Sequence, residues 1–181
     1  MTILHLGCGR DTLDIPEYKD ADIITLDQDA ELKPKIVCTL GRDLIPLADD
    51  SIDVAIAIHV LEHIGKQGET NEWFRFWEEL CRVLKPDGFL YFESPLYSSV
   101  WAWSDPSHTR ALSPWSFVFF QQESYRLKPT RISPFRINCD FVPMGFEKSS
   151  DESLEIQADE RFSHFKGQLR ANKPLKVWWK D

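Results

Sequence analysis

The amino-acid sequence predicts an α/β protein with a Rossmann-like open sheet that is mostly parallel and has helices on both faces. Three observations lead to this prediction. The chain begins with an apolar run that stops at a Gly-x-Gly turn, further short apolar runs follow between polar connections, and an amphipathic stretch then precedes another apolar run. Strands covered on both faces have continuous apolar runs, and strands separated by crossover connections form parallel sheets.

Four apolar runs predict the strands of the first half of the chain. The first, Ile3–Leu6, leads into a turn with glycine at two of three positions, where a ligand can lie against the backbone. The other runs are Ile23–Leu26 before Asp27, Ile36–Cys38 before Thr39, and Val54–Ile58. The connection from residue 10 to residue 21 leaves little room for a full helix, so a trimmed form of the fold is expected.

Residues 71–84 form the clearest predicted helix. The residues that recur at helical spacing on its apolar face are Phe74, Trp77, Cys81 and Leu84. The segment Lys85–Gly88 ends the helix, and Phe89–Phe92 is expected as a fifth strand. A second helix is expected from a Ser113 cap to about Tyr125.

Residues beyond 126 carry weaker signals. Residues 136–142 and 175–179 are predicted as short strands, and residues 151–161 as a helix. The chain of 181 residues is most simply one domain, and it is long enough to bury a substantial core.

Composition limits the class of protein. The formal net charge of −8 argues against a general nucleic-acid surface. The four cysteines form no C-x-x-C pair and the sequence has no H-E-x-x-H motif, so neither a metal site nor a disulfide framework is expected. The sequence has no secretory leader and no apolar run long enough to span a membrane, so a cytoplasmic location is expected.

Three segments together resemble one protein family. They are LHLGCG at residues 4–9, LIPLADDSIDVAIAIHVLEHI at residues 44–64 and LCRVLKPDGFLYFESP at residues 80–95. In this order and at this spacing they resemble the motifs of class I S-adenosylmethionine-dependent methyltransferases, in particular the small branch with an LEH motif after the fourth strand. The run DPSHTR at residues 105–110 is similar to a run in related methyltransferases and extends the resemblance to about residue 125.

The resemblance implies that S-adenosylmethionine is the cofactor and binds at the carboxyl ends of the strands. Asp27 would accept hydrogen bonds from both ribose hydroxyls, although it would hold a nicotinamide cofactor equally well. The structural alternative for Asp27 is a strand-end carboxylate exposed to water. Thr39 stands where the family often has an acid for the adenine amino group. The residues expected to bind the cofactor are Gly7, Cys8, Gly9, Asp27, Thr39, Leu40, Ile58 and His59.

The run Asp105–Arg110 lies where members of the family build the wall of the substrate site. Methyl transfer requires mainly that the acceptor is held in close contact, and a hydroxyl or amine acceptor also needs a base. His108, with Asp105 nearby, would be that base, and Arg110 would anchor an acidic group of the acceptor. The structural alternative is that these three residues bond one another and hold an ordered loop.

The leading hypothesis is a methyltransferase that acts on a small-molecule or glycan-like acceptor, because the chain is acidic and has no basic tail. A basic, aromatic segment between residues 110 and 136 keeps a nucleic-acid acceptor open. The alternative is a catalytically inactive methyltransferase-like module that binds the cofactor or a partner. A nicotinamide oxidoreductase is disfavoured, because Thr12 stands where the dinucleotide motif needs a third glycine. Residues 1–97 would form the cofactor-binding core, and residues 98–181 a substrate-side segment with C-terminal strands.

Overall fold

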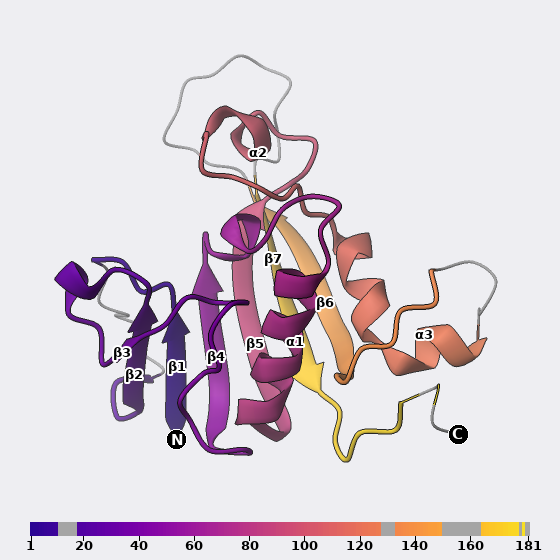
Figure 1. The fold of residues 1–181 in the computed structure, drawn as a ribbon, viewed down its shortest axis with the longest axis horizontal. Coiled ribbons are helices and arrows are strands. Elements are labelled where there is room, and N and C mark those ends of the chain that lie inside the picture. The colour runs from indigo at the N-terminus through magenta and orange to yellow at the C-terminus, as the bar shows by residue number, and fades with distance from the viewer. Residues whose placement is uncertain (11–17, 128–132, 150–163, 178, 180–181) are drawn as a thin grey trace.

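The computed structural model describes residues 1–10, 18–127, 133–149, 164–177 and 179. A sheet of seven strands forms its centre (Figure 1). The strands are β1 (Thr2–Leu6), β2 (Asp22–Asp27), β3 (Ile36–Val37), β4 (Ile52–Ile58), β5 (Leu84–Pro95), β6 (Phe141–Ser149) and β7 (His164–Ala171). None of the described helices is long and apolar enough to cross a membrane.

The strand order is β3-β2-β1-β4-β5-β7-β6. Neighbouring strands are parallel from β3 to β5, whereas β7 runs antiparallel to both β5 and β6. The prediction of a Rossmann-like, mostly parallel sheet is confirmed. The chain moves outward from β1 to β3 and then returns to place β4 on the other side of β1, and such a reversal opens a crevice at the carboxyl ends of the strands.

Aromatic side chains fill the layer between the sheet and its covering helices. These helices are α1 (Asn71–Val83), the 3-10 helix η4 (Pro114–Phe120) and α3 (Gln122–Leu127), which lie on the same side of the sheet in Figure 1. Trp77 of α1 is fully buried, stacks on Phe120 with 4.5 Å between ring centroids, and meets Phe141 of β6 at 5.3 Å. Offset and edge-on ring pairs of this kind add to the stabilisation from burial alone.

The opposite face of the sheet has a smaller apolar cluster. Ile3, Val54 and Ile56 form it, and Tyr18 and Ile23 pack against them. Residues 11–17, which connect β1 to β2, lie outside the described residues. The extent of the first crossover therefore stays a prediction.

The predicted helix over residues 71–84 is confirmed as α1, which ends at Val83. The second predicted helix is divided. Residues 114–120 form a 3-10 helix, Gln121 is extended, and α3 begins at Gln122. Gln122, the first residue of α3, is fully buried, and its side-chain amide donates to Cys139 O at 2.7 Å.

Predictions for the last part of the chain are wrong in part. The strand expected over residues 136–142 begins only at Phe141, and the described residues of 175–179 form no strand. β7 has no counterpart among the predicted strands, because Gly167 and Ala171 occupy two of its inward positions and weaken its apolar alternation. The helix expected over residues 151–161 lies outside the described residues.

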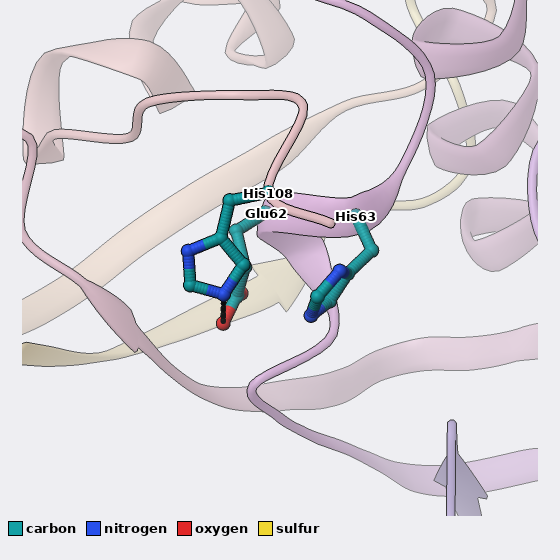
Figure 2. A group of neighbouring side chains, drawn as sticks. All are labelled: Glu62, His63 and His108. Atoms are coloured by element: carbon teal, nitrogen blue, oxygen red, sulfur yellow. Dashed lines mark ion pairs between the residues drawn. The ribbon is translucent and has the colours of Figure 1, made fainter. Parts of the chain in front are cut away.

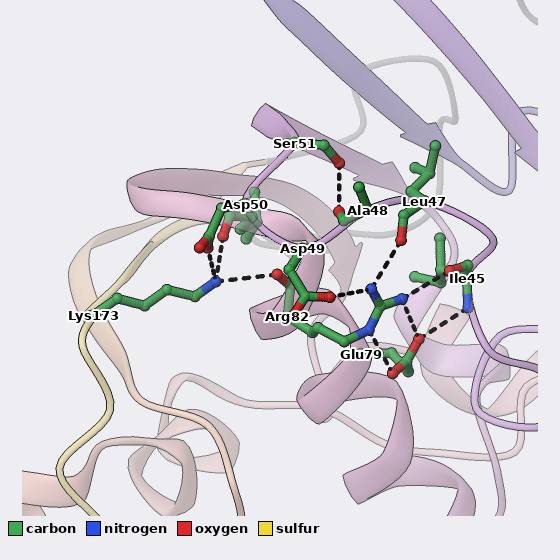
Figure 3. Close-up of polar contacts among 10 residues, drawn as sticks. Ile45, Leu47, Ala48, Asp49, Asp50, Ser51, Glu79, Arg82 and Lys173 are labelled. Carbon is green, nitrogen blue, oxygen red and sulfur yellow. Dashed lines mark hydrogen bonds and ion pairs between the residues drawn. The ribbon is translucent and has the colours of Figure 1, made fainter.

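Arg82, in the last turn of α1, fastens the segment that precedes β4 (Figure 3). Its guanidinium forms a fork with Glu79, with nitrogen–oxygen distances of 3.0 and 2.8 Å. It also donates to Asp49 at 2.7 Å and to the backbone oxygens of Ile45 and Leu47 at 2.8 Å each. All five N–H groups of the guanidinium therefore have an acceptor.

The carboxylate of Glu79 is buried beneath this guanidinium. Burial raises the pKa of Glu79, but hydrogen bonds from Arg82 and from the Ile45 backbone outweigh it, so the pKa lies below its ordinary value. Lys173 brings the C-terminal segment to the same place, where it pairs with Asp50 and donates to the backbone oxygens of Arg82 and Leu84. The network thus joins three separate parts of the chain.

Candidate functional site

A cavity of about 490 Å³ lies at the carboxyl edge of β1 to β4. Five of the residues predicted to bind a cofactor line it, namely Gly7, Asp27, Thr39, Leu40 and His59. Each of them ends a strand or lies in the connection that follows one. The sheet therefore brings together in space the residues that the sequence places after separate strands.

Asp27 connects the ends of β1 and β2. Its Oδ2 accepts from the Gly9 N–H at 2.8 Å, and its Oδ1 accepts from the Asp29 N–H at 2.9 Å. The residue is only 9% exposed, so the water-exposed carboxylate considered from the sequence is not what the structure contains. Each carboxylate oxygen keeps a lone pair beyond the one used by its backbone partner. Asp27 can thus fasten the glycine turn and still accept hydrogen bonds from a ligand.

Three other predicted cofactor residues do not line the cavity. The N–H groups of Cys8 and Gly9 point to the end of β2, where Cys8 donates to Leu26 O at 3.0 Å. These two residues shape the turn. Ile58 ends β4 and is 42% exposed, but its side chain does not reach the cavity wall.

Gly7 has a φ of +54°, and a Cβ atom there would lie 2.6 Å from Cγ2 of Val60. We expect Gly7→Ala to destabilise the protein, with overpacking alone costing about 1–3 kcal/mol. Gly9 is the matched control, because its φ is +55° but a Cβ atom there would have nothing within 4 Å. Urea unfolding of both variants should show the larger loss for Gly7→Ala, and equal losses would contradict the close contact with Val60.

Sequence reasoning missed the outer wall of this cavity. Arg42 follows β3 and Glu72 lies in the first turn of α1, and their side chains pair across the cavity rim at 2.9 Å. A further constraint lies at Gly41, whose φ is +81° and whose Cβ would lie 2.5 Å from the backbone oxygen of Glu72. No local pattern relates the two segments, because they lie 30 residues apart.

A buried carboxylate lies behind the end of β4. Glu62 belongs to the short 3-10 helix η3 (Leu61–His63) and is 1% exposed. Its Oε2 accepts from the Ser94 hydroxyl at 2.9 Å, and its Oε1 lies 3.4 Å from Nδ1 of His59. Burial raises the pKa of Glu62, but the His59 imidazole, the backbone and Ser94 outweigh it, so the pKa lies below its ordinary value.

A second cavity, of about 530 Å³, adjoins the first. His59 and His63 line both cavities, and the second also contains Asp105, His108 and His164. Four of the five histidines in the chain thus lie around one space. The rings of His59 and His164 meet edge to face with their centroids 4.9 Å apart.

His108 is held by the short helix α2 (Trp101–Ser104). Its Nδ1 lies 2.9 Å from the Trp101 carbonyl oxygen, while its Nε2 lies 3.9 Å from Asp105 Oδ2 and 4.0 Å from Glu62 Oε1. Asp105 in turn accepts from the backbone N–H of Ser107 at 2.8 Å and from its hydroxyl at 2.5 Å. His108 and Asp105 therefore line the second cavity. The backbone N–H of His108 donates to the Asp105 backbone oxygen at 3.1 Å, but their side chains are too far apart for a hydrogen bond.

Arg110 lines neither of these cavities. Its guanidinium donates to the backbone oxygens of Ile64, Lys66 and Glu69 at 3.2, 2.8 and 2.9 Å. It also lies 4.4 Å from the ring centroid of Trp73. These contacts give Arg110 a structural role in holding the connection before α1, but with backbone partners and not with Asp105 and His108, as the structural alternative had it.

Comparisons with known proteins show which family model and which solved structures the chain is similar to. Residues 4–92 match the model of a family described as a methyltransferase domain. No curated protein matches the chain.

Solved structures of low sequence identity have a similar fold. One is a SAM-dependent methyltransferase from Archaeoglobus fulgidus, with 17% identity, a TM-score of 0.61, and coverage of 93% of this chain and 85% of that chain. A second is the 1,6-didemethyltoxoflavin-N1-methyltransferase from Burkholderia thailandensis with bound 1,6-didemethyltoxoflavin and S-adenosylhomocysteine, with 12% identity, a TM-score of 0.57, and coverage of 95% and 71%. A third is the cyclase SpnF, with 15% identity, a TM-score of 0.58, and coverage of 94% and 74%.

Proposed function

We propose that the chain is a class I S-adenosylmethionine-dependent methyltransferase, which the match of residues 4–92 to a methyltransferase-domain model supports, and that it methylates a small-molecule or glycan acceptor. S-adenosylmethionine is its cofactor. The observation that carries the proposal is the pair of adjoining cavities that share His59 and His63. One cavity would hold the methyl donor and the other the acceptor, so that the two meet at the shared wall.

The residues of the first cavity fit the donor. The Asp27 carboxylate, with one lone pair free on each oxygen, suits two neighbouring ribose hydroxyls. The glycine turn offers bare backbone beside it, and Thr39 and Leu40 would contact the adenine. His59 lies at the wall towards the second cavity and would face the methionine end. When bound, S-adenosylmethionine supplies a methyl group on a positively charged sulfur.

The second cavity would hold the acceptor. Nδ1 of His108 faces a carbonyl oxygen and therefore carries the hydrogen, which leaves the lone pair of Nε2 for the cavity. A hydroxyl or amine of the acceptor would donate to this nitrogen and so be held in close contact with the donor. Asp105 would orient the same group, while Arg110 would act as a positioning residue through the loop that it holds.

Binding and transfer can be tested separately. Calorimetry should detect binding of S-adenosylmethionine and S-adenosylhomocysteine to the purified protein. A labelled donor should then transfer its methyl group to a component of pooled metabolites or oligosaccharides. Labelling of nucleic acid alone would overturn the proposed acceptor class. Donor binding without transfer to any pool would favour the catalytically inactive module.

The His108→Ala variant tests whether the two cavities have separate roles. We expect turnover at saturating donor to fall roughly 100-fold, because the acceptor loses a positioning contact. Donor affinity should stay close to that of the wild type, since His108 does not line the first cavity. A fall in donor affinity together with unchanged turnover would assign the loop to the donor site.

A further inference from the structure

Three side chains with metal-ligating atoms meet where the two cavities adjoin. Glu62 and His63 belong to η3, and His108 belongs to the loop after α2. Their ligand atoms all lie within 4.8 Å of one another (Figure 2). Glu62 and His63 are neighbours in the sequence, whereas His108 comes from a distant segment that the fold brings to them.

One oxygen of this group has no hydrogen-bond donor. Glu62 Oε1 is buried and accepts no hydrogen bond in the described part of the chain, while Oε2 is fixed by Ser94. It lies 3.4 Å from His59 Nδ1 and 4.0 Å from His108 Nε2. Apart from the ion pair with His59, this buried oxygen has lone pairs to offer, and a bound cation would use them.

Both imidazoles are held in the form that binds a metal. Nδ1 of His63 lies 3.1 Å from the Ser107 carbonyl oxygen, and Nδ1 of His108 lies 2.9 Å from that of Trp101. A carbonyl oxygen only accepts, so each Nδ1 carries a hydrogen and each neutral ring keeps the Nε2 lone pair. Contacts of this kind between the second ring nitrogen and a carbonyl are usual for histidines that ligate metals.

We propose that Glu62 Oε1, His63 Nε2 and His108 Nε2 bind one divalent transition-metal ion of the zinc class. Two imidazole nitrogens and one carboxylate oxygen suit Zn²⁺ and its neighbours, whereas Ca²⁺ and Mg²⁺ prefer oxygen ligands throughout. Three protein ligands leave a fourth position open to water or substrate. The absence of a local metal motif does not argue against the site, because one ligand comes from a different segment.

The proposed ion lies beside the acceptor cavity. His63 lines both cavities and His108 lines the second. An ion there would occupy Nε2 of His108 in place of the acceptor and would itself polarise an acceptor oxygen. The metal site goes beyond the proposed methyl transfer and can be tested without donor or acceptor.

Metal binding should be measured directly on protein that carries no polyhistidine tag and has been stripped with a chelator. We expect calorimetry to show one equivalent of bound Zn²⁺, and one equivalent of Co²⁺ should give the intense visible absorption of a four-coordinate site. His63→Ala and Glu62→Gln should each weaken Zn²⁺ binding by at least about 10-fold. The conservative Glu62→Gln change keeps an acceptor for Ser94, and circular dichroism should show that both variants are folded.

His164→Ala is the matched control. His164 lines the second cavity and contacts His59, but it is not one of the three proposed ligands. Its replacement should leave Zn²⁺ affinity unchanged. The proposal is overturned if the wild type binds no stoichiometric Zn²⁺, or if His63→Ala and Glu62→Gln bind it as tightly as the wild type. Either result would leave the donor-binding and methyl-transfer tests unaffected.

Discussion

Asp27→Ala is expected to weaken S-adenosylmethionine binding by at least about 100-fold, because two charge-assisted hydrogen bonds contribute about 1.5–3 kcal/mol each. Asp27 is 9% exposed and lies in the wall of the first cavity. Water is therefore poorly placed to replace the carboxylate as the hydrogen-bond partner of the ribose hydroxyls. Calorimetric titration of the variant with S-adenosylmethionine and S-adenosylhomocysteine measures the loss for both ligands.

The same substitution removes the acceptor for two backbone N–H groups, at Gly9 and Asp29. A control must therefore distinguish lost ligand contacts from a disturbed turn. Asp29→Ala provides it, because Asp29 is exposed and accepts from the Glu31 N–H at the start of η2 (Ala30–Leu32). We expect near wild-type donor affinity for Asp29→Ala. Unchanged affinity in Asp27→Ala would disprove the ribose assignment, whatever its effect on unfolding.

The first half of the fold could be predicted because its signals are local. Each of the first four parallel strands contains a short apolar run, and several of these runs end at a residue with a distinct chemical character, such as Gly7, Asp27 or Thr39. The carboxyl ends of parallel strands meet at one edge, so knowing the strands was enough to place these residues together. The direct contact between Asp27 and the Gly9 backbone follows from the pairing of β1 with β2.

The rest of the site depends on contacts between distant segments. Arg42 meets Glu72, and His108 meets Glu62, across loops whose paths no periodicity encodes. The sequence predicted that Arg110 anchors an acidic group, because guanidinium groups often bind anions. In the structure its guanidinium donates hydrogen bonds to backbone oxygens of another loop. Which partner a long cationic side chain finds is decided by tertiary packing.

The antiparallel end of the sheet was the hardest part to predict. β7 lies between β5 and β6, and its inward Gly167 allows the Phe92 ring to approach so closely that a Cβ would lie 2.5 Å from it. A residue without a side chain gives no apolar signal, although it marks a closely packed position. The aromatic residue that fills the space belongs to a strand far away in the sequence.

Arg82→Ala is expected to cost about 3 kcal/mol of unfolding free energy. Removing one partner of a buried ion pair costs about 3–5 kcal/mol, and we expect the lower end because the Arg82 side chain is 29% exposed. In the variant, the Glu79 carboxylate keeps the hydrogen bond from the Ile45 N–H. The hydrogen bonds of Arg82 to Ile45 O, Leu47 O and Asp49 are lost. Urea unfolding at neutral pH measures the loss.

Arg75→Ala is the matched control, since Arg75 lies exposed on the same helix and acts on Glu79 through its charge, and its loss should change stability by less than about 0.5 kcal/mol. The pH dependence supplies a second check. Because the folded-state pKa of Glu79 is lowered, the ion pair contributes stability above the ordinary pKa, and this contribution is lost as pH falls through the folded-state value. The difference between wild type and Arg82→Ala should therefore shrink on acidification. A difference that stays constant with pH would mean that Arg82 stabilises the fold through its backbone-oxygen contacts and not through Glu79.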